Sequence, residues 1–90
     1  MSRARSVEVR NARGLHARAS AKLVKAVQPF EAEVKVGKDG QAVDARSIMG
    51  LLMLGAGQGS TLEITAEGPD ADAALDAVVA LVEARFDEEA

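Results

Sequence analysis

The fold is decided in the stretch Asn11-Ala12-Arg13-Gly14-Leu15-His16-Ala17-Arg18-Ala19-Ser20, where a strand ends and a helix begins. Before it, Ser6-Val7-Glu8-Val9-Arg10 alternates polar and apolar residues, which is typical of a half-buried strand. After it, the segment from Ala17 to about Gln28 carries apolar residues at helical spacing, and Pro29 ends the helix. The inward face of this helix is predicted to consist of Ala17, Ser20, Leu23, Val24 and Val27.

The remaining sequence predicts three more strands and two more helices. The predicted strands in this part are Ala32–Val36, about Gln41–Asp44 and Thr61–Ala66, and a hairpin turn at Gly37–Gly40 joins the first two. One helix runs from the N-cap Ser47 through Leu54 with Gly55 as its stop, and the last helix is capped by Asp70. The apolar stripe of the last helix is predicted to be Ala71, Ala74, Leu75, Val78, Leu81, Val82 and Arg85/Phe86. The acidic run Asp87-Glu88-Glu89 is expected to be a solvated end.

The order βαββαβα, with one apolar face on each strand, predicts the fold class. A sheet with a single apolar face needs cover on one side only, so three helices on that side are the simplest solution. We therefore expect an α+β open-faced two-layer sandwich, formed by residues 1–90 as a single domain.

Composition excludes several classes of function. The chain has no cysteine and one histidine, which leaves no disulfide and little to bind a metal tightly, and fits a reducing cytoplasm. No apolar run approaches the roughly 20 residues that span a bilayer, so no membrane insertion is expected. The net charge is −3, with bases concentrated in the first half and acids in the last third, which argues against nucleic acid as the main partner. Gly55–Gly59 follows a helix and lacks the Lys-Ser/Thr of a nucleotide loop, and we expect no cofactor.

His16 is the main candidate for chemistry, because neutral imidazole is a nucleophile near physiological pH. A helix N-terminus offers free backbone N–H donors and a positive dipole end to an arriving anion. Arg18 adds a guanidinium fork that matches phosphate oxygens. We therefore predict that His16 accepts a phosphoryl group and that the backbone N–H groups of Ala17 and Arg18, with the Arg18 side chain, hold its oxygens.

The segment from Ile48 to Leu54 is apolar on all sides, which a surface helix does not need. Leu51 and Leu54 are predicted to enter the core. Ile48, Met49 and Leu52 are then left partly exposed, and exposed apolar surface rimmed by polar groups marks an interface. Ser47 needs no role beyond capping this helix.

His16 with its flanks resembles the active-site signature of the HPr family, the histidine-containing phosphocarriers of the bacterial phosphoenolpyruvate-dependent phosphotransferase system. Arg46-Ser47-Ile48-Met49-Gly50-Leu51-Leu52-Met53-Leu54-Gly55 resembles the regulatory-serine helix of the same family. The resemblance covers nearly the whole chain and implies a four-stranded antiparallel sheet under three helices.

The same resemblance implies partners and roles. Enzyme I donates the phosphoryl group to Nδ1 of His16, and an enzyme IIA domain receives it. HPr kinase adds a second, regulatory phosphate to Ser47, although capping alone explains that serine equally well. The protein is then a carrier rather than an enzyme, and a monomer suffices. The alternative is a regulatory docking module of the nitrogen-related phosphotransferase branch. A small hydrolase is disfavoured because no base–nucleophile pair or metal cluster is present.

Ala19 departs from the family pattern, which usually has proline after the arginine. With His16 as the N-cap, Ala19 is the third helical residue and supplies a backbone N–H that proline lacks. We therefore expect one extra donor near the imidazole or phosphate and a slightly less rigid helix start.

The substitution Ala19→Pro tests that expectation, because it removes the extra donor and stiffens the first turn. We predict a changed hydrolytic lifetime of the phosphohistidine, measured by loss of label over time. An unchanged lifetime would show that the extra N–H does not reach the phosphate.

Overall fold

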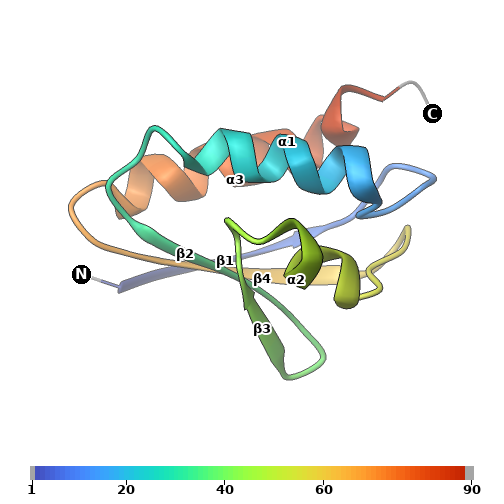
Figure 1. Cartoon of the computed structure of the whole chain (residues 1–90), viewed down its shortest axis with the longest axis horizontal. Helices are drawn as coiled ribbons and strands as arrows, with labels where there is room; N and C mark the ends of the chain where they lie inside the picture. Colours follow the sequence, from blue (N-terminus) through green and yellow to red (C-terminus); the bar gives the residue numbers. More distant parts are fainter. Residues whose placement is uncertain (1, 89–90) are drawn as a thin grey trace.

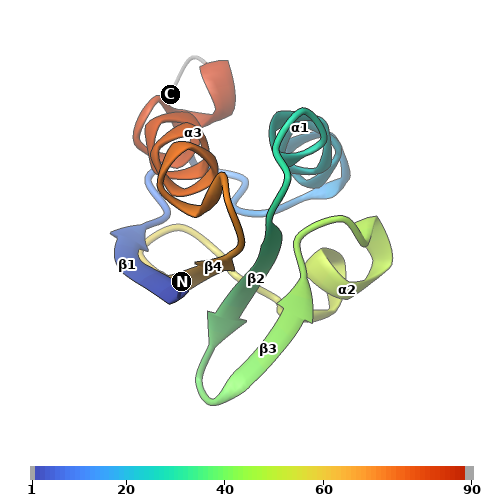
Figure 2. The same cartoon turned by 90° about the vertical axis from the view of Figure 1, so that its left-hand side faces the viewer.

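The computed structural model describes residues 2–88 of the chain. In chain order its elements are β1 (Ser2–Glu8), α1 (Ala17–Val27), β2 (Glu33–Lys38), β3 (Gln41–Asp44), α2 (Ile48–Met53), β4 (Thr61–Glu67), α3 (Ala71–Glu83) and the short 3-10 turn η1 (Arg85–Asp87). The strands form one sheet in the order β1-β4-β2-β3, and every neighbouring pair is antiparallel. The helices α1 and α3 lie side by side over one face of the sheet, and α2 packs beside α1 near β3 (Figures 1 and 2). The predicted α+β open-faced sandwich is confirmed.

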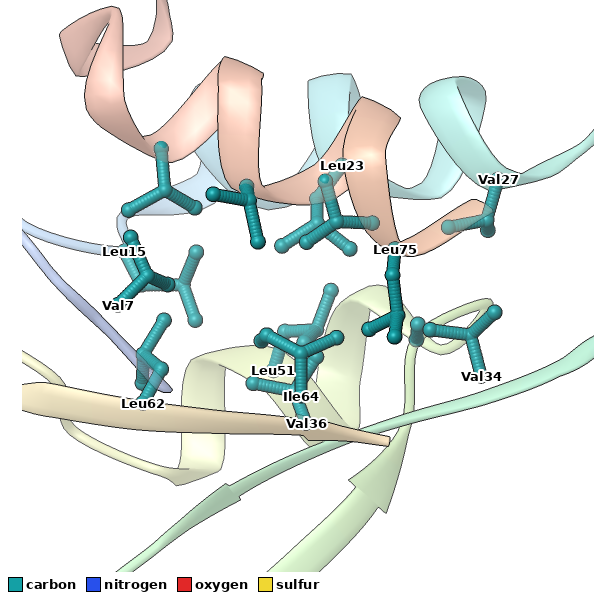
Figure 3. Close-up of a cluster of buried hydrophobic side chains, with 14 of the residues drawn as sticks. Val7, Leu15, Leu23, Val27, Val34, Val36, Leu51, Leu62, Ile64 and Leu75 are labelled. Carbon is teal, nitrogen blue, oxygen red and sulfur yellow. The ribbon is translucent and has the colours of Figure 1, made fainter. Parts of the chain in front are cut away.

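The core lies between the sheet and the helices (Figure 3). Alternate residues of β2 and β4 point into it, and four-residue spacing along α1 and α3 supplies the opposite wall. Its fully or almost fully buried members include Val34, Val36, Leu62, Ile64, Ala66, Leu23, Val27, Leu75, Val78 and Phe86. Burial of this apolar surface is the main force that holds the two layers together. Within residues 2–88, no helix has both the length and the apolar character needed to cross a bilayer.

Strand β1 begins four residues earlier than predicted and ends at Glu8 rather than Arg10. The early part is polar, so it shows no alternation of apolar residues. Its helix-facing positions carry Arg3 and Arg5, which form ion pairs with Asp72 at 3.0 Å and Asp76 at 3.4 Å on α3. Arg3 and Arg5 therefore occupy strand positions at which apolar residues normally indicate the buried face.

Strand β2 continues through Lys38, so the predicted four-residue turn is shorter than expected. Only Asp39 and Gly40 form it, with φ values of 51° and 84°. Two successive residues at positive φ suit the right-handed twist of the hairpin. Strand β3 has the predicted bounds, and β4 runs one residue further than predicted at its end.

The inward face of α1 differs from the prediction at its start. Ala19, Ser20, Leu23 and Val27 are buried, Val24 is partly buried, and Ala17 is exposed. Ala19 precedes Leu23 by four residues and so lies on the same stripe. Ala17 lies off that stripe, which leaves it on the solvent side of the first turn.

The prediction that Asp70 caps α3 is correct for its position but wrong for its hydrogen bonds. Asp70 stands at the N-cap position but makes no side-chain cap bond. Its carboxylate instead accepts the Glu31 N–H at 2.7 Å, and its own N–H donates to the Glu31 carbonyl at 3.1 Å. Asp70 therefore ties the α1–β2 loop to the start of α3. The helix ends at Glu83, so Phe86 enters the core from η1 rather than from the helix.

The helix α2 divides its apolar residues between core and solvent as predicted. Leu51 is fully buried and Leu54 nearly so, whereas Ile48, Met49 and Leu52 are exposed. Met53, which the sequence analysis did not single out, is the most exposed of the large apolar residues that the structure describes, at 75%. The Ser47 hydroxyl oxygen accepts the Gly50 N–H at 3.0 Å, so the predicted cap is formed.

The loop between β1 and α1 is held against the loop after α2. The Leu15 N–H donates to the Ala56 carbonyl at 2.8 Å, and the Leu15 side chain is buried. Gly14 has φ +64°, and a Cβ on it would lie 2.4 Å from the Ala56 oxygen. Only glycine satisfies both the backbone angle and this close approach.

We predict that Leu51→Ala lowers the free energy of unfolding by about 2–5 kcal/mol, because it leaves a cavity in the core. Leu52→Ala, one position along the same helix and with 38% of its surface exposed, should cause a clearly smaller loss. Urea denaturation of both variants measures the difference. Equal losses would contradict the division of α2 into a buried and an exposed face.

Gly14→Ala and Gly55→Ala form a second matched pair, since both glycines have φ near +60°. A Cβ on Gly55 meets nothing within 4 Å, so that variant pays only the left-handed backbone penalty of about 1–2 kcal/mol. Gly14→Ala also overlaps the backbone of residues 56–57, and we expect it to lose about 1–3 kcal/mol more. Equal thermal denaturation midpoints for the two variants would refute the close-approach argument.

Candidate functional site

His16 lies at the N-cap of α1 with extended backbone angles, φ −78° and ψ −176°. Its carbonyl accepts the Ser20 N–H at 2.8 Å, which is the first rung of the helix. Its ring nitrogen Nδ1 accepts the Arg18 N–H at 3.3 Å. The side chain is 23% exposed, so the ring is reachable from solvent while one nitrogen faces the free donors of the first helical turn.

A shallow hollow of about 300 Å³ lies beside the imidazole. It is lined by Arg13, Leu15, His16, Leu52, Gly55, Ala56 and Gly57. The close approach of Gly14 to residues 56–57 brings these two loops together, and Leu52 extends the hollow onto α2. Arg18 and Ala17 are exposed on the first turn of α1. Arg13, from the loop before α1, also lines the hollow.

The exposed apolar side chains of α2 continue from this hollow. Ile48, Met49, Leu52 and Met53 are the large hydrophobic residues that stand exposed among those described, and we refer to them as the α2 patch. Three of the four were predicted as a partner surface. Leu52 belongs both to the patch and to the wall of the hollow, so a partner that covers His16 also reaches the patch.

Ser47 is the N-cap of α2 and follows a residue that contacts the far end of α1. The neighbouring Arg46 guanidinium donates to the carbonyls of Val27 at 3.0 Å and Ala32 at 2.8 Å, which lie at and beyond the far end of α1. His16 begins that helix and Val27 ends it. The Arg46 side chain therefore links the start of α2 to the C-terminal end of α1, whereas His16 lies at the N-terminal end of α1.

Glu88 is the residue that the sequence analysis missed. One carboxylate oxygen contacts His16 Nε2, and the other accepts the Asn11 Nδ2–H at 3.0 Å. The hydrogen bond with His16, followed by that with Asn11, lowers the pKa of Glu88 below its usual value. The expectation of a solvated acidic end is therefore wrong for Glu88, because η1 turns the chain back onto α1. Asp87 is exposed as expected, and Glu89 lies outside the described residues.

Asn11 is fully buried between the loop and Glu88. Its amide nitrogen donates to the Gly14 carbonyl at 2.8 Å as well as to Glu88. Two acceptors on the same side fix the orientation of the amide, and Oδ1 is left buried without a partner among residues 2–88. Asparagine is common in turns for local reasons, so its presence here does not indicate this longer-range link.

Residues 2–88 contain no group of three or more His, Cys, Asp or Glu that could hold a metal ion. Another hollow, of about 420 Å³, lies on the open face of the sheet near the β2–β3 hairpin and is lined by residues such as Ser6, Lys38 and Thr65. It includes none of the predicted site residues, so the chemistry is concentrated at the start of α1.

Comparison with known proteins places this arrangement in a family. The family model described as the PTS HPr component phosphorylation site matches residues 3–84, so Glu88 lies beyond the matched stretch. The chain is 49% identical over 84 residues to the phosphocarrier protein HPr of Cupriavidus necator, covering 93% of this chain and 94% of that protein. It is 48% identical to the phosphocarrier protein NPr of Shewanella violacea, covering 93% and 92%. The crystal structure of HPr from Thermoanaerobacter tengcongensis superposes with a TM-score of 0.93 at 40% identity, covering 98% of this chain and 99% of that one.

Sequence, fold and family model agree, and the chain belongs to the HPr phosphocarrier family of the phosphotransferase system.

Proposed function

We propose that this protein carries a phosphoryl group on His16, which it accepts from phospho-enzyme I and passes to an enzyme IIA domain. The position of the imidazole supports this most directly. Nδ1 accepts the Arg18 N–H at the N-terminus of α1, so a lone pair points toward the end of the helix that attracts anions.

The first step is an in-line displacement at phosphorus. The Nδ1 lone pair forms the N–P bond, while the bond to enzyme I breaks and its electron pair leaves with that protein. Once Nδ1 is bonded to phosphorus, the Arg18 N–H loses its acceptor and becomes free to donate to a phosphoryl oxygen. The N–H of Ala17 and the exposed Arg18 guanidinium lie in the same first turn of α1 and serve as further donors. The second step reverses these events toward a nucleophile of the IIA domain.

The hollow and the α2 patch form the docking surface in this proposal. Ile48, Met49 and Leu52 supply apolar contact, to which Met53 is added, and methionine adapts to partners of different shape. Arg13 and Arg18 supply positive charge near the hollow, which favours an acidic partner face. A shallow surface of this kind fits transient association, which a carrier that serves two partners requires.

We further propose that Ser47 is a regulatory phosphorylation site for HPr kinase/phosphorylase. Its hydroxyl is half-buried at the start of α2, next to Ile48 of the patch. A phosphate there adds up to about two negative charges, which the α2 dipole tolerates but an acidic partner face does not. Because Ser47 adjoins the α2 patch, such regulation acts on docking.

A second candidate function is regulatory docking in the nitrogen-related branch of the phosphotransferase system. It is favoured by the near-equal similarity of the chain to relatives named HPr and NPr. In that case the same patch binds a target protein, and the phosphorylation state of His16 decides whether it binds. Phosphoryl transfer and regulatory docking both depend on the same phosphorylation of His16.

Incubation with phosphoenolpyruvate and purified enzyme I should add one acid-labile phosphate per chain, measured by mass spectrometry. His16→Ala should abolish the label. Arg18→Ala should slow labelling by roughly tenfold or more, because a charge-assisted donor is lost.

Lys25→Ala is the matched control, since it removes a cation from the far end of α1. Its labelling rate should equal that of the wild type. Label that survives in His16→Ala would overturn the proposed carrier role.

A further inference from the structure

Glu88 and the Arg18 backbone together determine which nitrogen of His16 carries a proton. An ionised carboxylate only accepts hydrogen bonds, so Nε2, which contacts Glu88, must be the protonated nitrogen. A backbone N–H only donates, so Nδ1, which faces Arg18, must carry the lone pair. The lowered pKa of Glu88, to which its hydrogen bonds with His16 and Asn11 contribute most and the charge of Arg13 adds, keeps the carboxylate ionised near neutral pH.

The C-terminal segment is shaped so that Glu88 reaches the ring. Arg85, Phe86 and Asp87 have φ values of 59°, 53° and 60°, an unfavourable conformation for three successive non-glycine residues. This turn is held by the fully buried Phe86 side chain and by Lys22, whose Nζ donates to the Phe86 carbonyl at 2.6 Å. The Glu88 N–H closes the turn onto the Arg85 carbonyl at 2.9 Å. In Figure 1 the red C-terminal segment accordingly lies near the start of α1.

Glu88 does not cover the reacting atom. Nε2 and Nδ1 are on different edges of the ring, and Glu88 contacts the former while the Arg18 N–H approaches the latter. The Asn11 amide fixes the second carboxylate oxygen, so both oxygens of Glu88 are bonded and the side chain is only 16% exposed. The arrangement orients the ring without blocking access to Nδ1.

We propose that Glu88 is a positioning residue for phosphoryl transfer, which holds the proton on Nε2 and so presents Nδ1 as the nucleophile. The inference rests on the proposed carrier function of His16. As the Nδ1–P bond forms and the bond to the phosphoryl donor breaks, Nε2 keeps its proton and the ring becomes positively charged. The adjacent Glu88 carboxylate offsets that charge. When the phosphoryl group is handed on, the N–P electron pair returns to Nδ1 and the neutral ring is restored.

The tautomer is measured by ¹⁵N NMR of the untagged protein at a pH at which the ring is neutral. His16 is the only histidine, so the spectrum contains one pair of ring nitrogens. The wild type should show the Nε2–H tautomer as the dominant form. Glu88→Ala should give a mixture of both tautomers, whereas Glu88→Gln keeps a side-chain oxygen that accepts the Nε2–H and should retain the wild-type tautomer.

Glu88→Gln keeps the hydrogen bond but loses the charge, so its rate of phosphorylation by enzyme I measures the effect of the charge. We expect Glu88→Gln and Glu88→Ala to slow phosphorylation by about ten- to a hundredfold, by analogy with the loss when the hydrogen-bond partner of a metal-ligating histidine is removed. Asp87→Asn is the control: it removes one negative charge at the neighbouring exposed position, and asparagine tolerates positive φ. It should match the wild type in both measurements.

An unchanged tautomer ratio in Glu88→Ala, or labelling that is unchanged or faster in the Glu88 variants, would overturn the proposal. Faster labelling would show that Glu88 obstructs the site. Failure of the wild type to accept phosphate would refute the carrier function and the transfer role together. The tautomer measurement on unphosphorylated protein then still decides whether Glu88 orients the ring.

Discussion

The contact between the β1–α1 loop and residues 55–57 is the constraint on which the site depends. Leu15 is fixed in the core and bonded to the Ala56 carbonyl, and Gly14 leaves no room for a side chain. Because both residues are held in place, the next residue, His16, lies at the edge of the core as the N-cap residue of α1. The same contact forms part of the wall of the hollow beside the imidazole. Loop stability and site shape are therefore set by the same atoms.

Most of the fold could be predicted because its signals are local. The alternation that places Val34, Val36 and Ile64 on one face, and the four-residue spacing of Leu23 and Val27, depend only on neighbours in sequence. The errors fall where a distant partner decides the structure. The start of β1 is polar because its arginines meet acids of α3, and Asp70 bonds to a loop almost forty residues earlier instead of capping its own helix.

Prediction of the site was limited in the same way. His16 and Arg18 lie in one short motif, so their spacing alone suggested phosphate chemistry. Glu88 is 72 residues from His16 and reaches it only through a left-handed turn without glycine, which has no signature in sequence. An acidic residue near a chain end normally indicates a solvated tail. Asn11 likewise looks like an ordinary turn residue until its partner is known.

The charges around His16 differ on the two edges of its ring, which suits the proposed carrier role. Arg13, Arg18 and the N-terminus of α1 attract a phosphoryl dianion, whereas Glu88 adds a negative charge on the other edge of the ring. Because the carboxylate is fixed by Asn11 and directed at Nε2, it can offset a positive charge on the ring without approaching the position of the phosphate. The strained C-terminal turn is thus the structural feature that places a negative charge beside Nε2, while the positive elements lie on the side of Nδ1.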